Sequence, residues 1–201
     1  MTKNIAIFSS GRGSNFSVIA RQVKKGTIKA NLALLVCDQP KAKVLQKAKR
    51  AKVKAAVIER KDFSSKESFE AKVIEYLEAN KIDLIVLAGF MRMLSAEFVR
   101  RYCGKIINIH PALLPSFKGE EGIKDAFVYG VKVTGVTVHF VDEEMDHGPI
   151  ILQKEVKIDE KDTLETLETK IHKAEHKLYP KAIQLFVEGR LSLSGRKVKV
   201  F

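Results

Sequence analysis

Two polar residues that suit acyl-transfer chemistry lie at the end of an expected buried strand. Asn108 and His110 are two positions apart in the apolar run 105–110, so both side chains point to the same face of that strand. An amide can donate to a developing oxyanion, and an imidazole can carry a proton near neutral pH. The pair also fits a structural histidine with satisfied hydrogen bonds. Pro111 and Pro115 make the following turn rigid in either case.

A carboxylate that could serve His110 lies further along the chain, in the segment Asp146-His-Gly-Pro149. Asp146 could orient the His110 ring, or raise its pKa by charge pairing. It could instead be a loop aspartate that shapes a turn. The sequence alone leaves both interpretations open.

A glycine-rich turn, Gly11-Arg12-Gly13-Ser14-Asn15, joins an expected first strand to an expected helix. The glycines let the backbone approach a ligand, and the helix start offers N–H groups and a positive dipole end to a phosphate. Phe16 stands where a dinucleotide fingerprint has its third glycine, and the sequence lacks the Gly-Lys-Ser/Thr of a P-loop. We therefore expect a monophosphate site. The alternative is a tight turn in which Ser14 or Asn15 caps the helix.

Metal and disulfide chemistry are not expected. His172 and His176 are spaced like a metalloprotease pair, but Lys173 stands where the general-base glutamate would follow the first histidine. Cys37 and Cys103 form no C-x-x-C motif, so we expect neither a structural zinc site nor a disulfide scaffold. Two such cysteines suggest a reducing, cytoplasmic location.

The formal net charge of +12 suggests an anionic partner, which could be a nucleic acid, a membrane surface or a small phosphorylated or carboxylated ligand. The most basic stretch, 41–54, interleaves lysines with alanines and valines and contains no aromatic residue for base stacking. It is typical of a solvated helix face. Without aromatic residues for stacking there, we expect no nucleic-acid partner. No run of eighteen apolar residues and no signal peptide is present, so we expect no membrane partner.

The elements that must position these residues alternate between strand and helix patterns. Continuous apolar runs indicate parallel strands covered on both faces, at 4–10, 32–37, 55–58 and 83–88. Segments 132–141 and 150–158 predict an antiparallel pair, and 163–187 predicts a long amphipathic helix interrupted or kinked at Pro180. We predict an α/β fold in a single domain, 1–201.

Together these segments resemble the phosphoribosylglycinamide formyltransferases, folate-dependent enzymes of purine synthesis. The resemblance runs nearly end to end. It rests on the turn 11–15, Leu87-Ala-Gly-Phe-Met-Arg-Met-Leu94, Asn108-Ile-His-Pro-Ala-Leu-Leu-Pro115, Gly135-Val-Thr-Val-His-Phe140, Asp146-His-Gly-Pro-Ile-Ile-Leu-Gln153 and Glu175-His176. It implies a Rossmann-like, mostly parallel sheet, with 1–90 mainly serving the phosphate substrate and 91–201 mainly folate binding and catalysis.

The resemblance also implies the reaction and the roles of residues. A formyl group would pass from 10-formyltetrahydrofolate to the amine of glycinamide ribonucleotide, without metal, in a monomer or homodimer. Asn108, His110 and Asp146 would be catalytic. Residues Gly11 to Asn15 would hold the phosphate, and Glu175 the glycinamide end. The folate pocket would include Lys66, Met91, Arg92, Met93, Leu94 and Asn108.

Three positions depart from the family pattern. Lys118 replaces a proline, Ala112 stands where serine is more usual, and His147 stands where a small residue is frequent. Alternative functions are another formyl-folate enzyme, namely a formyltetrahydrofolate hydrolase or a methionyl-tRNA formyltransferase, and a noncatalytic basic nucleotide-binding module. The hydrolase and the tRNA enzyme normally carry an additional domain, for which 201 residues leave no room.

Overall fold

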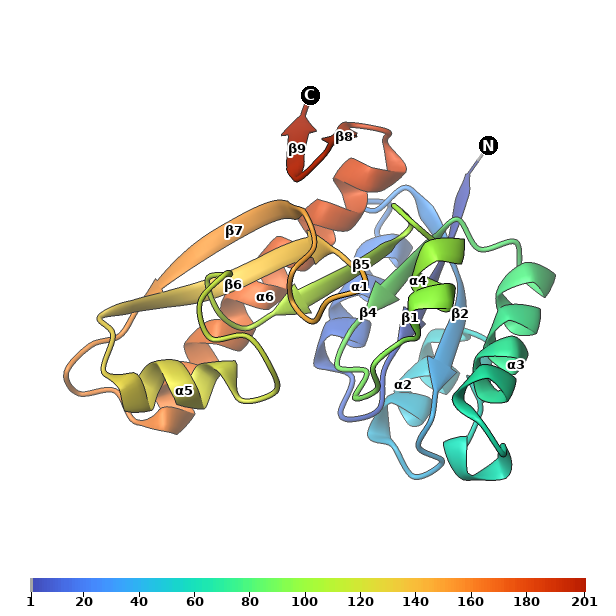
Figure 1. The fold of residues 1–201 in the computed structure, drawn as a ribbon, viewed down its shortest axis with the longest axis horizontal. Helices are drawn as coiled ribbons and strands as arrows, with labels where there is room; N and C mark the ends of the chain where they lie inside the picture. The colour runs from blue at the N-terminus through green and yellow to red at the C-terminus, as the bar shows by residue number, and fades with distance from the viewer. Residues whose placement is uncertain (1) are drawn as a thin grey trace. The chain divides into compact units, whose positions relative to one another are not determined.

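A computed structural model describes residues 2–201, which form two compact units: one extends to Ile107, and the other is Asn108–Phe201 (Figure 1). The chain is α/β, with a mostly parallel sheet, an antiparallel strand pair in the C-terminal half and a long C-terminal helix. This is the predicted fold class.

The first unit has a parallel sheet with the strand order β3-β2-β1-β4. Four consecutive residues are buried at the end of β1, at the end of β2 and throughout β4; since neighbouring side chains point to opposite faces, both faces of the sheet are covered. The strands are β1 (Lys3–Phe8), β2 (Ala30–Cys37), β3 (Ala55–Val57) and β4 (Leu84–Leu87). The helices are α1 (Ser14–Lys24), α2 (Lys43–Ala51), the 3-10 turn η1 (Arg60–Asp62), α3 (Lys66–Ala79) and α4 (Ala96–Arg101).

Strand β5 (Ile106–His110) ends inside the second unit, where the antiparallel pair of β6 (Val133–Phe140) and β7 (Ile150–Lys157) follows. Helix α5 (Gly122–Tyr129) lies between β5 and β6 in the sequence, and helix α6 (Leu164–Val187) packs along β6 and β7 (Figure 1). Thr163 caps α6 by accepting a hydrogen bond from the Thr166 N–H.

Helix α6 continues through Pro180, so the predicted interruption there is wrong. Tyr179, Pro180, Ala182 and Ile183 are all buried. Packing of these side chains compensates for the backbone hydrogen bond that the proline cannot donate.

Residues 191–200 form a hairpin that the sequence analysis did not predict. Strands β8 (Leu191–Ser194) and β9 (Lys197–Val200) pair antiparallel, and Lys197 of β9 pairs with Ile150 at the start of β7. Alternation of polar and apolar residues in both strands, around Gly195 with a positive φ of 55°, was the available signal. None of the helices in the described part of the chain is long and apolar enough to span a membrane.

Strand β6 lies very close to its neighbours at Gly135. A Cβ at this position would lie 2.2 Å from the Lys154 carbonyl oxygen and 2.7 Å from Leu113 Cδ2. We expect Gly135→Ala to lower the free energy of unfolding by about 1–3 kcal/mol, as overpacking of a core does. Chemical denaturation measures the loss.

Gly11→Ala is the matched control, because a Cβ there would meet no atom of the described residues within 4 Å. We expect its free energy of unfolding to stay within about 0.5 kcal/mol of the wild type. Equal stability of the two variants would contradict the close approach at Gly135.

Candidate active site

Three sequence-predicted residues come together in the second unit. Asn108 and His110 lie on β5, and Asp146 lies in the loop between β6 and β7. Asp146 Oδ2 is 3.2 Å from His110 Nδ1, and Asp146 Oδ1 is 3.5 Å from Asn108 Nδ2. Asp146 therefore contacts both β5 side chains, as the orienting role requires.

The His110 ring faces an oxygen at each nitrogen. Nδ1 faces Asp146, and Nε2 lies 2.7 Å from the backbone oxygen of Phe117. A neutral imidazole can donate from only one nitrogen, so each neutral tautomer leaves a lone pair facing an oxygen. Only the imidazolium satisfies both contacts. The contacts thus favour the protonated ring.

Burial acts in the opposite direction. The His110 side chain is only 3% exposed. Desolvation lowers its pKa below the ordinary 6.5 and outweighs the nearby Asp146 carboxylate and the Phe117 carbonyl, both of which raise it. Asp146 thus raises the His110 pKa in the expected direction, but desolvation outweighs this contribution. The net effect favours the neutral imidazole.

The Asp146 carboxylate stays ionised despite its burial. Desolvation is the largest single influence and raises its pKa, but contacts that favour the anion outweigh it, and the pKa is lowered. The Gly119 N–H donates to Oδ2 over 2.9 Å, and His139 Nε2 lies 3.7 Å from Oδ1. A side-chain hydrogen bond with His139 and the electrostatic influence of both histidines lower the Asp146 pKa as well.

Sequence reasoning missed His139, Phe117 and Gly119. His139 lies on β6, where its Nδ1 contacts the Phe140 carbonyl oxygen over 2.8 Å and its Nε2 lies 3.4 Å from Asn108 Nδ2. Phe117 and Gly119 act through backbone groups, which their residue types do not reveal. The available signal was His139 itself, within a segment that carried the family resemblance.

Helix α5 shields His110 on the same side as Phe117. A Cβ on Gly122 would lie 2.9 Å from the Phe117 oxygen and 3.1 Å from His110 Nε2. Glycine therefore allows the start of α5 to approach the imidazole. The Phe117 carbonyl, in the segment before α5, thereby stays in contact with His110 Nε2.

In the first unit, the glycine-rich turn leads directly into α1. Gly13 is the N-cap, with φ of 66°, so the alternative in which Ser14 or Asn15 caps the helix is wrong. A Cβ on Gly13 would lie 2.5 Å from Val44 Cγ2, which explains the glycine. Lys47 Nζ, 3.2 Å from the Gly13 oxygen, adds a cation that sequence reasoning did not single out.

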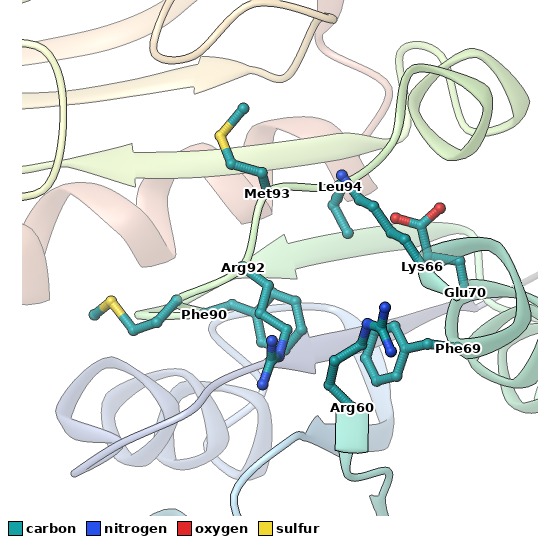
Figure 2. Close-up of a pocket in the computed structure, with 9 residues that line it drawn as sticks. Arg60, Lys66, Phe69, Glu70, Phe90, Arg92, Met93 and Leu94 are labelled. Carbon is teal, nitrogen blue, oxygen red and sulfur yellow. The ribbon is translucent and has the colours of Figure 1, made fainter. Parts of the chain in front are cut away.

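A cavity of about 330 Å³ in the first unit brings together other predicted residues (Figure 2). Arg92 is held there by Asp38, whose buried Oδ2 is 2.6 Å from Nε, and Met91 N donates to Ser10 Oγ over 3.1 Å. The cavity has a cationic and apolar character. Its lining residues are Arg60, Lys66, Phe69, Glu70, Phe90, Met91, Arg92, Met93 and Leu94.

The cavity lining contains Lys66 and residues 91–94 as expected, and also Arg60, which the sequence did not single out. Arg60 comes from η1, a segment without a strong sequence pattern. Asn108 is not a lining residue. The Glu70 carboxylate accepts hydrogen bonds from the backbone N–H and the hydroxyl of Ser95.

Glu175 lies on α6 with only 6% of its surface exposed, and its Oε2 is 3.1 Å from His172 Nδ1. His172 thus pairs with a carboxylate on its own helix. Within residues 2–201, no group of three or more His, Cys, Asp or Glu side chains could hold a metal ion.

A family model described as "Formyl transferase" matches residues 3–183. The chain belongs to the formyl transferase family. Of its relatives, the phosphoribosylglycinamide formyltransferase of Bacillus subtilis is 50% identical over 90% of this chain and 93% of its own.

Two solved structures of glycinamide ribonucleotide transformylases are similar to this formyl transferase. Glycinamide ribonucleotide transformylase 1 from Symbiobacterium toebii has a TM-score of 0.97 and 40% identity, covering 100% of this chain and 94% of its own. The enzyme of the same name from Geobacillus kaustophilus has a TM-score of 0.91 and 46% identity, covering 93% and 100%. Both likenesses extend over nearly the whole formyl transferase chain.

The lowered His110 pKa makes the stability of this formyl transferase depend on pH. Below an unfolded-state pKa of about 6.5, the unfolded chain binds a proton at this histidine more readily than the folded chain does. The contribution of neutral His110 to folding is therefore fully present above about pH 6.5 and is lost as the pH falls toward the lower folded-state value.

We expect the free energy of unfolding of the wild type, relative to His110→Gln, to fall between pH 7.5 and pH 5. Denaturant titrations of both proteins across this range measure the difference. Above pH 7.5 the difference should be constant, which serves as the internal control. A difference that grows on acidification would show that the folded-state pKa is raised instead.

Proposed function

We propose that this chain transfers the formyl group of 10-formyltetrahydrofolate to the primary amine of glycinamide ribonucleotide, N1-(5-phosphoribosyl)glycinamide, in purine biosynthesis. Family membership and the similarity to enzymes named for this substrate support the reaction class. The observation that carries the chemistry is the buried cluster in which Asp146 contacts both Asn108 and His110.

In the proposed step, the substrate amine attacks the formyl carbon and forms a new C–N bond. The carbonyl oxygen becomes an oxyanion, which the Asn108 amide stabilises by donating a hydrogen bond. The bond from carbon to the folate nitrogen then breaks. The proton lost by the attacking amine is delivered to that leaving nitrogen, so no covalent enzyme intermediate forms.

His110 would carry this proton. Its lowered pKa favours the neutral ring at the start, so the imidazole can accept the proton from the attacking amine. The resulting imidazolium would be stabilised by Asp146 and then donate to the folate nitrogen. For Nε2 to reach the reacting atoms, the Phe117 carbonyl must first move away from it.

The phosphate of the ribonucleotide would bind at Gly11 to Asn15, where the N–H groups that begin α1 and the positive helix dipole favour an anion. Arg12 is exposed at this turn, and Lys47 lies against Gly13. Glu175 would bind the amine end, because its buried carboxylate suits a cationic or hydrogen-bond-donating group.

The folate would bind at the cavity formed by Lys66 and residues 90–94. Phe90 and the methionines offer apolar contacts to a ring system, and Arg60, Lys66 and Arg92 offer cations to the carboxylates of a glutamate tail. We propose that both units act as one formyltransferase domain.

We further propose a cytoplasmic protein that acts as a monomer or homodimer on small molecules. Cys37 and Cys103 are free thiols, which suits a reducing compartment. The positive charge would then serve anionic small substrates, by raising their local concentration through the general field of the protein.

The decisive experiment is an assay of the purified protein with 10-formyltetrahydrofolate, in the presence and absence of glycinamide ribonucleotide. We expect folate turnover only with the ribonucleotide. Turnover without it would support the hydrolase instead. Absence of turnover in both conditions, with salt-sensitive binding to DNA or RNA, would support the noncatalytic module.

In the same assay, we expect Asn108→Ala to lower the rate by about 10²–10³, as loss of an oxyanion-hole donor does. His110→Ala and Asp146→Asn should each reduce turnover severely while circular dichroism stays like that of the wild type. Normal turnover of Asn108→Ala would remove its amide from the mechanism.

The folate assignment predicts a selective effect of Lys66. We expect Lys66→Ala to raise the KM for 10-formyltetrahydrofolate by up to about fivefold, since a partly exposed ion pair is worth up to ~1 kcal/mol. The KM for glycinamide ribonucleotide should be unchanged. Steady-state kinetics with each substrate varied in turn measure both values.

Lys61→Ala is the matched control, because this exposed lysine pairs with Glu59 and does not line the cavity. We expect it to leave both KM values unchanged. An equal rise of the folate KM in the two variants would indicate a general loss of positive field rather than a contact with folate.

A further inference from the structure

The turn of the C-terminal hairpin lies beside the loop that carries Asp146. Lys197, the first residue of β9, pairs with Ile150, the first residue of β7. The loop 141–149 ends immediately before Ile150. Arg196, one residue before β9, is therefore within reach of this loop.

Arg196 binds the residue next to Asp146 at two points. Its Nη2 donates to the backbone oxygen of His147 over 2.6 Å, and its Nη1 is 2.9 Å from the Nε2 of the same residue. The other ring nitrogen, Nδ1, is 2.7 Å from Asp142 Oδ2. The same Nη1 also lies 3.2 Å from Nδ1, so the guanidinium and the Asp142 carboxylate both contact the His147 ring. Arg196 thus contacts His147 directly, and His147 in turn contacts Asp142 near the start of the loop.

The rest of the loop is tightly constrained. The Phe140 N–H donates to the Pro149 oxygen over 2.9 Å, and a Cβ on Gly148 would lie 1.9 Å from the Phe140 oxygen. Asp146 itself has a φ of 49°, in the left-handed region that residues with a side chain rarely adopt. Surrounding contacts must hold a residue in such a conformation.

We propose that Arg196 is a positioning residue, which holds His147 and thereby keeps the Asp146 carboxylate directed at His110. This inference rests on the catalytic role proposed for Asp146. The hairpin lies outside residues 3–183, which the family model matches, and His147 stands where the resemblance expects a small residue.

The test compares Arg196→Ala with the wild type in steady-state kinetics and in amide hydrogen exchange of peptides that cover 141–149. We expect kcat to fall about tenfold, less than the ~10²-fold that a 1 Å misplacement can cost, because the other loop contacts remain. The KM of each substrate should stay within about twofold. Amide exchange in the loop should become faster.

Two variants separate positioning from general stability. Arg196→Lys should recover part of the lost kcat, since a lysine can donate to the His147 oxygen but cannot reproduce the two-pronged contact. Arg190→Ala removes a different hairpin arginine, whose Nε donates to the Phe201 oxygen. It should leave kcat and the exchange of 141–149 unchanged.

His147→Ala should resemble Arg196→Ala, and the double variant should be no slower than either single variant, because both residues act through one contact. Unchanged kcat and exchange in Arg196→Ala would overturn the proposal, as would an equal kcat loss in Arg190→Ala. Failure of the proposed function is distinct: the wild type would not transfer formyl groups, or Asp146→Asn would retain normal turnover.

Discussion

The buried carboxylate of Asp146 is the interaction on which the candidate active site depends. Burial alone would favour its neutral form, so its charge must be stabilised by neighbouring groups. The Gly119 N–H, His139, His110 and Asn108 all lie around its two oxygens. These stabilising contacts also fix the orientation of the residues that make them, which is how one charge organises the site.

His110 shows the same competition with the opposite outcome. Both ring nitrogens face oxygens, which favours the imidazolium, yet desolvation is stronger and lowers its pKa. The conflict suits a group that must gain and lose a proton in one turnover, because contacts that favour the imidazolium oppose the desolvation that favours the neutral ring. Phe117 and Gly122 create part of this environment through backbone approach, not through side-chain chemistry.

Much of the fold was predictable because its signals are local. Apolar runs predicted the buried strands β1, β2 and β4, and 3.6-residue periodicity predicted α6. The predicted interruption of this helix at Pro180 was wrong, because packing of a buried helix outweighs the loss of one backbone hydrogen bond. The β8–β9 hairpin was missed although its polar and apolar residues alternate around Gly195, because two strands this short depend for their stability on pairing with each other and with β7.

By itself, the sequence determined the α/β class, the family, and the candidates Asn108, His110 and Asp146, because residue type and spacing along one strand or loop carry that information. Only the tertiary structure decided which carboxylate faces His110, that its net pKa falls, and that Arg60 lines the cavity. The physical reason is that desolvation and hydrogen bonding depend on groups distant in sequence. Chain folding alone brings these groups within a few ångströms.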